Sequence, residues 1–316
     1  MESAYKSSDL VLIVPTKDRP QKITDLLDSL VNQTVGCGRI IIVDGGESIE
    51  SIISSYADRL PIEYYACQPP GQIRQRNRAL SKLDETTSLV GFFDDDIVLE
   101  NQALEEMLAC WNRREANTAG ISFNIVNNPP IKHSWLRRLA GMDSDQLGNI
   151  LKSGYNIPIS PIDEDIKSQW LCGGATVWQQ KILLQQHSCK EVRTNWAICE
   201  DIIFSYPISK EQPLYVCAAA RVRHEHVYDH TQKMKHKYYG RNATLWRFYF
   251  VEEHPELSRL CFIWMILCQV IARLISGVVR LRLSDIQYAI GQVEGLFGGL
   301  SAIFQGVTII SILEEN

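Results

Sequence analysis

Three consecutive aspartates, Asp94, Asp95 and Asp96, have the clearest chemical potential in this 316-residue chain. They follow a fully apolar run, Leu89 to Phe93. Adjacent carboxylates repel one another unless a cation neutralises them, and buried acids are rare without a partner. Hard divalent cations such as Mg²⁺ or Mn²⁺ take oxygen ligands and bridge carboxylates to a diphosphate. The triplet therefore predicts a metal-assisted nucleotide site, with a solvated strand end as the alternative.

A second acidic pair, Glu200-Asp201, precedes the apolar residues of a predicted helix. The dipole of a helix favours acids in its first turn, so ordinary capping is one interpretation. The other is a general base, which would take a proton from an attacking hydroxyl group.

The segment His224-Glu225-His226 follows a predicted strand. Two residues at this spacing point to the same face of an extended segment. An imidazole from here could complete the metal site, whereas exposed loop histidines are the alternative.

Arginines are concentrated in the run from Gln72 to Arg78, directly after Pro69-Pro70-Gly71. Guanidinium groups suit phosphates and stacking on bases. A solvated helix face is the competing interpretation. Arg241-Asn242 could also contact a phosphate or an acceptor.

Short apolar runs alternate with helical patterns along the first hundred residues, which predicts βαβ units and a parallel sheet covered on both faces. The predicted strands are Leu10–Val14, Ile40–Val43, Ile62–Cys67 and Leu89–Phe93, with a helix at Gln21–Gln33. Ligands bind outside the carboxyl ends of such strands. The segments Pro15–Arg19, Asp44–Gly46 and Asp94–Asp96 each follow a strand, so we expect them to share one site.

The middle of the chain has a less regular pattern. It predicts a helix at Asn101–Asn112, a strand at Ala119–Val126, a long loop at Asn127–Gln169, a helix at Glu200–Ser209 and a strand at Leu214–Val222. The loop carries four prolines and no sustained period, which is typical of a segment that shapes an active site.

Residues 251–316 differ from residues 1–250, which we take as the catalytic domain. Cys261–Val279 predicts an amphipathic helix with a wide apolar surface. Gly291, Gly295 and Gly299 form a row that permits close helix approach. Attachment to a membrane surface or a re-entrant segment explains this composition. The alternative is a pair of helices packed on the catalytic domain or at a homo-oligomer interface.

Composition limits the class of protein. A net charge of −5 gives no electrostatic reason to expect nucleic-acid binding. Nine cysteines, an odd number without a C-x-x-C pair, fit free thiols in a reducing compartment. The N-terminal apolar run indicates a strand and not a signal peptide, so we expect a cytoplasmic protein, peripheral on the cytoplasmic face of a membrane if the C-terminal helices attach there.

Taken together, these motifs resemble the family 2 glycosyltransferases, which have the GT-A fold, over roughly Leu10 to Asn242. The segments that carry the resemblance are Pro15-Thr16-Lys17-Asp18-Arg19, Val43-Asp44-Gly45-Gly46, Gly71 with Arg76-Asn77, Asp94-Asp95-Asp96, Gly173-Gly174-Ala175 and Glu200-Asp201. Their order and spacing make the resemblance specific. It implies an α/β fold with a mixed, mostly parallel, Rossmann-like sheet flanked by helices, followed here by apolar C-terminal helices.

The resemblance implies inverting transfer from a UDP-, GDP- or dTDP-sugar with Mn²⁺ or Mg²⁺. The donor-binding residues would be Pro15, Thr16, Arg19, Asp44, Gly71, Arg76, Asn77, Asp94 and Asp95. The metal ligands would be Asp94, Asp96 and His224, which is favoured over His226. The catalytic residue would be Asp201, with Glu200 beside it, and the acceptor-side residues would be Trp170, Gly173, Gly174 and Arg241. Gly45 stands where the family commonly has an acid, so recognition of the nucleotide base departs from the pattern there. Tyr206-Pro207 stands near where the family commonly has a basic residue, so contacts with the diphosphate also depart from it.

Two other functions compete with glycosyl transfer. A sugar-1-phosphate nucleotidyltransferase would want a glycine-rich loop after the first strand, and Pro15–Arg19 is not one. A non-catalytic, membrane-peripheral protein with a degenerate fold would not need intact acidic motifs. We therefore expect a glycosyltransferase whose acceptor is a saccharide or a lipid-linked saccharide, the latter suggested by the apolar helices.

Overall fold

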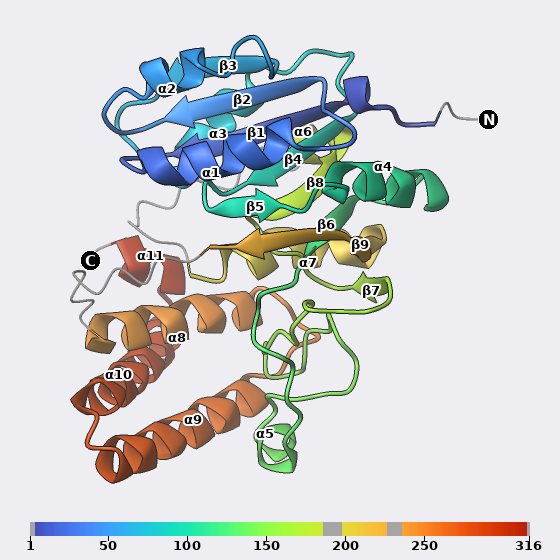
Figure 1. Ribbon diagram of the computed structural model, residues 1–316. Helices are drawn as coiled ribbons and strands as arrows, with labels where there is room; N and C mark the ends of the chain where they lie inside the picture. The colour runs from blue at the N-terminus through green and yellow to red at the C-terminus, as the bar shows by residue number, and fades with distance from the viewer. Residues whose placement is uncertain (1–3, 186–197, 226–235, 315–316) are drawn as a thin grey trace. The chain divides into compact units, whose positions relative to one another are not determined.

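The computed structural model describes residues 4–185, 198–225 and 236–314 (Figure 1). The chain divides into two compact units. The first consists of Met1–Ile131, Ile159–Glu191 and Phe204–His226, and the second of Lys132–Pro158, Val192–Ile203 and Val227–Asn316. The first unit contains the sheet, and the helices of the C-terminal region lie in the second.

Four parallel strands form one half of the sheet, in the order β3-β2-β1-β4. These are β1 (Leu10–Thr16), β2 (Arg39–Asp44), β3 (Ile62–Ala66) and β4 (Leu89–Phe93). Strands β1 and β4 are buried at every residue. Continuous apolar runs of this kind suit strands covered on both faces, because neither side chain direction meets water. The predicted parallel sheet is confirmed for this half.

The other half is mixed and continues in the order β4-β8-β6-β9-β5, with β7 paired to β9. Its strands are β8 (Ala175–Gln179), β6 (Gly120–Ile125), β9 (Leu214–His224), β5 (Ile97–Leu99) and β7 (Ile166–Ser168). Strand β8 runs antiparallel to both β4 and β6. Strand direction reverses between β4 and β8. Segments from both halves of the sheet meet there, beside the aspartate triplet.

Helices cover both faces of this sheet (Figure 1). Helices α1 (Pro20–Val31) and α4 (Ala103–Arg113) contribute to one apolar core with alternate residues of β1 and β2. Helix α3 (Gln72–Leu80) packs against β1 and β2, and α2 (Glu50–Ser54) and α6 (Gln180–Gln185) are short flanking helices, while η1 (Ser7–Asp9) is a 3₁₀ turn before β1. Helix α1 begins with Pro20, whose fixed φ suits a first helical turn.

The second unit is built on a helical core of its own. Its helices are α5 (Trp135–Leu139), α8 (His236–Glu252), α9 (Arg259–Val279), α10 (Leu283–Gln305) and α11 (Ile309–Glu314). Helix α7 (Glu200–Glu211) begins in this unit and ends in the first. Phe248 and Phe262 stack with ring centroids 4.8 Å apart and are fully buried. Because α8 belongs to this core, the helical unit starts before the predicted boundary at residue 250.

Several elements differ from the sequence predictions. The long loop predicted at residues 127–169 contains α5 and β7, and residues 97–99 form the short strand β5. A three-residue strand has no detectable period, so only its pairing with β9 reveals it. Helix α8 was not predicted because it is rich in aromatic residues and contains Gly240, which lower intrinsic helix propensity. Packing against α10 overrides that propensity.

The glycine row on α10 brings this helix close to α8, as its spacing predicts. A Cβ atom at Gly291 would overlap the carbonyl oxygen of Lys237, and one at Gly299 would overlap the ring of Phe248. Only a hydrogen atom fits against the α8 backbone at Gly291 and against the Phe248 ring at Gly299. Gly298 lies on the same helix but faces no such contact, because the nearest atom to its Cβ position is 3.9 Å away.

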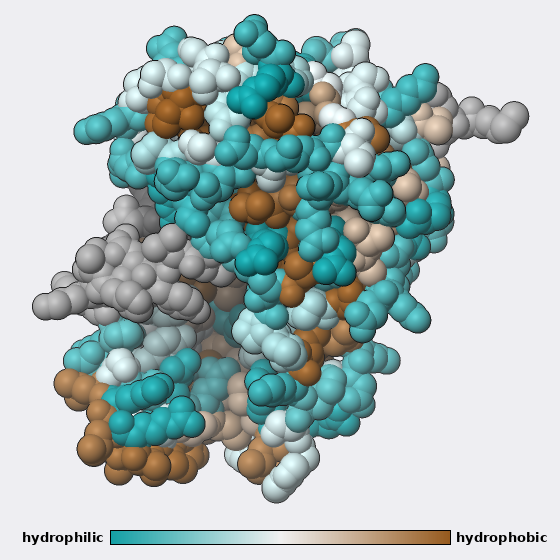
Figure 2. All heavy atoms as spheres, viewed as in Figure 1, coloured by the Kyte–Doolittle hydropathy of each residue, from teal (hydrophilic) through white to brown (hydrophobic). Residues whose placement is uncertain are grey.

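Helix α9 is the one helix in the described part of the chain that is long and apolar enough to cross a membrane, and 28% of its most apolar window is buried. Its exposed apolar residues include Leu260, Trp264, Leu267, Ile271, Leu274, Ile275, Val278 and Val279. Figure 2 shows hydrophobic residues gathered at the lower left of the view, where Figure 1 draws the end of α9. The apolar surface predicted for this helix is therefore largely uncovered within its own unit.

We expect Gly291→Ala to destabilise the protein by about 1–3 kcal/mol, the usual cost of overpacking, because α8 must move away from α10. The matched substitution Gly298→Ala should be neutral or stabilising by up to about 1 kcal/mol, because Ala is the better helix former. Chemical denaturation of both variants measures the difference. Equal stabilities would show that the glycine row does not hold the two helices together.

Candidate functional site

The carboxyl ends of β2, β1 and β4 lie side by side at one edge of the sheet, since β1 pairs with both neighbours in parallel. Thr16 at the end of β1 is in register with Asp44 at the end of β2. The aspartate triplet follows β4 at the same edge. The structure therefore brings together the three turns that sequence analysis expected to share a site.

Asp95 is the buried anchor of the triplet, with 4% of its surface exposed. One carboxylate oxygen accepts a hydrogen bond from the Thr16 hydroxyl at 2.8 Å, and the other pairs with the Arg19 guanidinium at 2.8 Å. Burial raises the pKa of Asp95, and the contacts with Thr16 and Arg19 oppose that shift. Partial burial disfavours the Arg19 cation, yet the neighbouring carboxylates raise its pKa overall. Asp95 thus joins the turn after β1 to the turn after β4.

Asp94 faces a different set of partners. Its Oδ1 accepts from Gln72 at 2.8 Å and pairs with Arg76 at 3.0 Å. Arg76 also donates to the carbonyl oxygen of Gly173 at 3.0 Å. A Cβ atom at Gly174 would overlap the Asp94 carboxylate, so only glycine permits this approach. Arg76 from the expected donor motif and Gly173-Gly174 from the expected acceptor motif therefore lie around one carboxylate.

Asp96 pairs with His224, whose Nε2 lies 3.0 Å from Oδ1 of Asp96. The pairing of β5 with β9 causes this contact, because Ile97 is in register with His224. The backbone N–H of Glu225 also donates to the carbonyl oxygen of Asp96 at 2.8 Å. A strand of three residues thus places the last aspartate of the triplet beside a histidine more than a hundred residues away in the sequence.

Asp94, Asp96 and His224 offer ligand atoms that all lie within 4.8 Å of one another. Two carboxylate oxygens and one imidazole nitrogen form a donor set that suits a divalent cation such as Mn²⁺. Asp95 lies outside this group, and its two oxygens contact Thr16 and Arg19 instead. The residues present therefore fit a metal ion at Asp94, Asp96 and His224.

Asp44 is 98% buried and is held from two sides. Its carboxylate accepts from the N–H of Gly46 at 2.8 Å and from the Tyr64 hydroxyl at 2.7 Å. Next to it lies an open cavity of about 750 Å³, lined by the turns after β1 and β2 and by Gln68 and Pro70. Its volume is in the range of pockets for small ligands. Asp44 holds the turn that forms one wall of this cavity.

The other candidate residues take supporting places. Pro15 lies inside β1, and Gly71 caps α3, where its N–H donates to Gln75 at 3.2 Å. Asn77 follows Arg76 on α3, and Trp170 precedes β8. Arg241 on α8 and the pair Glu200-Asp201 at the start of α7 belong to the second unit. His226 lies outside the described residues.

Three residues that the sequence analysis did not single out contribute to the site. Gln72 contacts Asp94, Tyr64 contacts Asp44, and Gln75 donates to the carbonyl oxygens of Thr16 at 2.8 Å and Val43 at 2.7 Å. Gln72, Gln75 and Arg76 share the i, i+3, i+4 face of one helix. That spacing was visible in the sequence and could have identified both glutamines.

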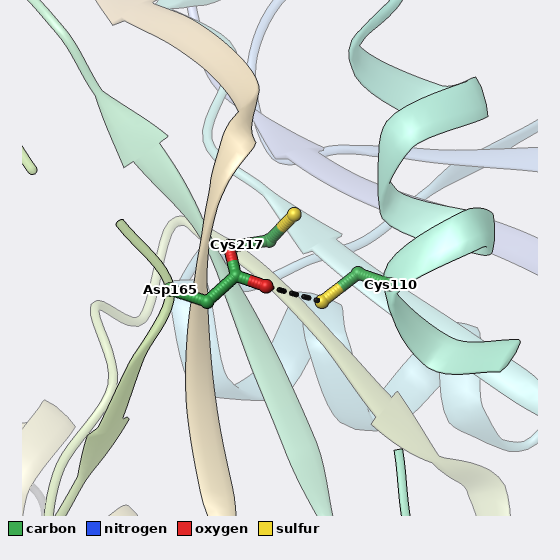
Figure 3. A group of neighbouring side chains, drawn as sticks. All are labelled: Cys110, Asp165 and Cys217. Carbon is green, nitrogen blue, oxygen red and sulfur yellow. Dashed lines mark hydrogen bonds between the residues drawn. The ribbon is translucent and has the colours of Figure 1, made fainter. Parts of the chain in front are cut away.

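A second group of candidate ligands, Cys110, Asp165 and Cys217, lies elsewhere in the same unit (Figure 3). Asp165 accepts from the N–H of Ala218 at 2.8 Å and from the Arg114 guanidinium, so both of its oxygens are engaged. The hydrogen bond to Cys217 lowers the pKa of the Cys110 thiol, and burial opposes that shift. Arg114 supplies the positive charge that a metal ion would bring, and we assign this group a structural role.

The sequence comparison agrees with the resemblance drawn from the motifs. Residues 11–159 match the model of the family described as glycosyl transferase family 2. This segment contains the turns after β1, β2 and β4 and the whole of α3. A search of curated proteins found no match.

Solved structures share the fold over most of the chain. The mannosyltransferase PcManGT from Pyrobaculum calidifontis, solved with GDP-Man and Mn²⁺, has a TM-score of 0.57 at 11% identity, covering 93% of this chain and 88% of that one. Residues 1–349 of TarS from S. aureus give a TM-score of 0.53 at 13% identity, covering 94% and 92%. GalNAc-T7, solved with UDP, GalNAc and Mn²⁺, gives 0.56 at 12% identity, with 98% of this chain and 59% of that chain covered. These likenesses show the GT-A fold, as predicted.

We expect Asp96→Ala to abolish Mn²⁺ binding and His224→Ala to weaken it at least tenfold, because each removes one ligand from the three-residue group. Glu100→Ala is the matched control, since Glu100 lies just after β5 and pairs instead with Arg221 at 2.8 Å. Isothermal titration of the protein with Mn²⁺ and a nucleoside diphosphate measures all three. Unchanged binding by Asp96→Ala would contradict the site.

Proposed function

We propose that this chain, whose residues 11–159 match glycosyl transferase family 2, is a metal-assisted glycosyltransferase that moves a sugar from a nucleotide diphosphate with inversion. The single observation that carries this proposal is the convergence of Asp94, Asp96 and His224 beside the carboxyl ends of the parallel strands. Such a group of oxygen and nitrogen ligands is suited to a cation that binds a diphosphate.

The donor would bind along the edge formed by the turns after β1, β2 and β4. The nucleoside would enter the cavity beside Asp44, and the diphosphate would lie toward the metal ligands. Arg19 and Arg76 supply positive charge on the two sides of the triplet, through their contacts with Asp95 and Asp94. The complexes of PcManGT with GDP-Man and of GalNAc-T7 with UDP support a donor of the UDP, GDP or dTDP class.

The cation would be Mn²⁺ more readily than Mg²⁺, because an imidazole nitrogen suits Mn²⁺ better than a cation that prefers oxygen ligands alone. When bound, it would neutralise negative charge that develops on the diphosphate as the sugar departs. The protein residues hold the reactants: Asp95 fixes Arg19, and Arg76 orients Asp94 through Oδ1.

Inversion requires a carboxylate that takes the proton of the acceptor hydroxyl as it attacks the anomeric carbon. We assign this role to Asp201, in the first turn of α7, with Glu200 as its neighbour. Both come from a different segment than the metal ligands, as a base opposite the leaving group must. Trp170, Gly173, Gly174 and Arg241 would contribute to the acceptor side.

We further propose that the protein works at the cytoplasmic face of a membrane and takes a lipid-linked saccharide. The support is the uncovered apolar face of α9, extended by Trp135, Leu136 and Leu139 of α5; the Trp264 indole donates to the carbonyl oxygen of Leu139 at 3.0 Å. Exposed arginines at the end of α9, Arg280 and Arg282, suit anionic headgroups. The eight described cysteines are free thiols, which suits a reducing compartment. A homo-oligomer would be the other way to cover this face.

The transfer reaction is tested by screening UDP-, GDP- and dTDP-sugars for Mn²⁺-dependent release of nucleotide. With the active donor, Asp201→Asn should lose about 10²- to 10⁴-fold in turnover while donor binding is retained, because only proton transfer is removed. Glu200→Gln, the adjacent acid, should lose less. Near-normal turnover by Asp201→Asn would exclude it as the base, and failure of every donor would contradict the proposed function.

Membrane attachment is tested by replacing single exposed apolar residues with an acid. Ile275→Glu on α9, where the native side chain is 59% exposed, should reduce sedimentation with anionic vesicles severalfold, because a charge on a buried membrane face is costly. Leu184→Glu on α6, 49% exposed, is the matched control and should sediment as the native protein does. If the native protein does not sediment with vesicles and instead forms a dimer, α9 is an interface between copies.

A further inference from the structure

The second unit contains a cavity of about 550 Å³ that the donor site does not use. Its lining comes from α8, α9 and α10, from the chain around Arg137 to Tyr155, and from Ile198 and Cys199. Those last two residues directly precede Glu200 and Asp201 in the sequence. All lining residues belong to the second unit.

Positive charge predominates in this cavity. Three arginines line it, Arg137, Arg247 and Arg273, against a single acid, Asp285. Arg273 lies 3.9 Å from Asp285, a distance at which the pairing is loose, and Asp285 also accepts from Ser276 at 3.0 Å. Two guanidinium charges are thus in excess among the lining residues, in a partly enclosed space where charge interactions are stronger than in water.

Neutral groups hold these arginines in place. Arg247 donates to the carbonyl oxygen of Gly154 and to Asn156, the latter at 3.1 Å, and Arg137 donates to the Tyr155 hydroxyl at 2.9 Å. Arg273 stacks over the Tyr288 ring at 3.7 Å. Contacts with neutral partners orient a guanidinium without cancelling its charge. Arginine held in this way is suited to bidentate binding of phosphate.

Groups that suit a sugar lie in the same cavity. Gln292 is 98% buried and donates to Gln269 at 2.6 Å, while its Oε1 accepts no hydrogen bond from the described residues. A buried amide oxygen calls for a donor such as a sugar hydroxyl. Burial raises the pKa of Tyr239 and of Tyr288, so both phenols remain hydroxyl donors.

We infer that this cavity binds the phosphate or diphosphate group of the acceptor, with the first sugar beside it. The inference rests on the proposed function, which it deepens by naming the acceptor class as a phosphorylated saccharide. An excess of guanidinium charge would hold the phosphate, and Gln292 and the tyrosines would bind hydroxyl groups. The cavity wall at Cys199 leads directly into Glu200 and Asp201, the acids from which the base is expected.

The same phosphate chemistry could come from a lipid headgroup or from a soluble sugar phosphate. The exposed apolar face lies on α9, which also supplies Arg273 and Gln269 to the cavity. A lipid phosphate would thus meet apolar and cationic surface on one helix. Comparing binding to phosphatidylcholine vesicles with and without a prenyl phosphate tests the lipid source. Binding of free pyrophosphate and of a sugar diphosphate tests the soluble source.

The binding test uses inorganic pyrophosphate as the probe, with the full chain in EDTA so that the metal-dependent donor site stays out of the measurement. Arg273→Gln should weaken pyrophosphate binding at least tenfold. Arg259→Gln is the matched control, since Arg259 begins the same helix, lies outside the cavity and pairs with Glu252 at 2.6 Å, and it should bind as the native protein does. Arg137→Gln is a second variant; its side chain is exposed, so the fold should tolerate it.

Two results would overturn the inference: no pyrophosphate binding by the native protein, or equal losses in Arg273→Gln and Arg259→Gln. Nucleoside diphosphate binding with Mn²⁺ is measured in parallel and should be the same in all of these variants. Because that second measurement concerns the other unit, a missing donor activity would contradict the proposed function alone. Intact donor activity with no cavity binding would contradict the acceptor site alone.

Discussion

Mutual repulsion among three adjacent carboxylates is the constraint on which the rest of the site depends. Asp94, Asp95 and Asp96 are half-buried or buried, and water cannot screen their charges fully. Arg76 pairs with Asp94, Arg19 with Asp95 and, at 3.4 Å, with Asp96, and His224 also contacts Asp96. These partners come from three different segments. Bringing them to the triplet therefore requires the folded sheet edge as a whole.

The sheet meets this requirement by changing strand direction at β4. The parallel half supplies Thr16 from the end of β1 and Arg19 from the turn after it, and the antiparallel neighbour β8 is preceded by Gly174, which contacts Asp94. On the far side, the short strand β5 pairs with β9 and fixes His224. A fully parallel sheet would place only strand ends and helix starts here. The mixed half adds His224 and the turn at Gly174 beside the aspartate triplet.

The parallel half and its turns were predictable from the sequence because apolar runs and motifs are local. The apolar run Leu10 to Val14 predicts a buried strand, and the residues after it predict a polar turn. The contact between Asp96 and His224 was not predictable in this sense, since it depends on a three-residue strand with no period of its own. The family resemblance suggested the histidine, and the β5–β9 register supplies the physical reason for His224. Helix α8 could not be predicted because its aromatic residues favour strands, and packing against α10 overrides that preference.

The two units differ in how their chemistry is encoded. In the first, the candidate site residues follow strands within a few residues, so a short motif carries each one. In the second, the arginines of the cavity are separated by long stretches: Arg137 precedes α8 by about a hundred residues, and Arg247 and Arg273 lie on different helices. None of them stands in a motif, and each alone reads as a solvated charge. Only the packing of α8, α9 and α10, which the glycine row permits, gathers them around one space. Substitutions on α9 or α10 can therefore alter this cavity while they leave the strand-end motifs of the first unit untouched.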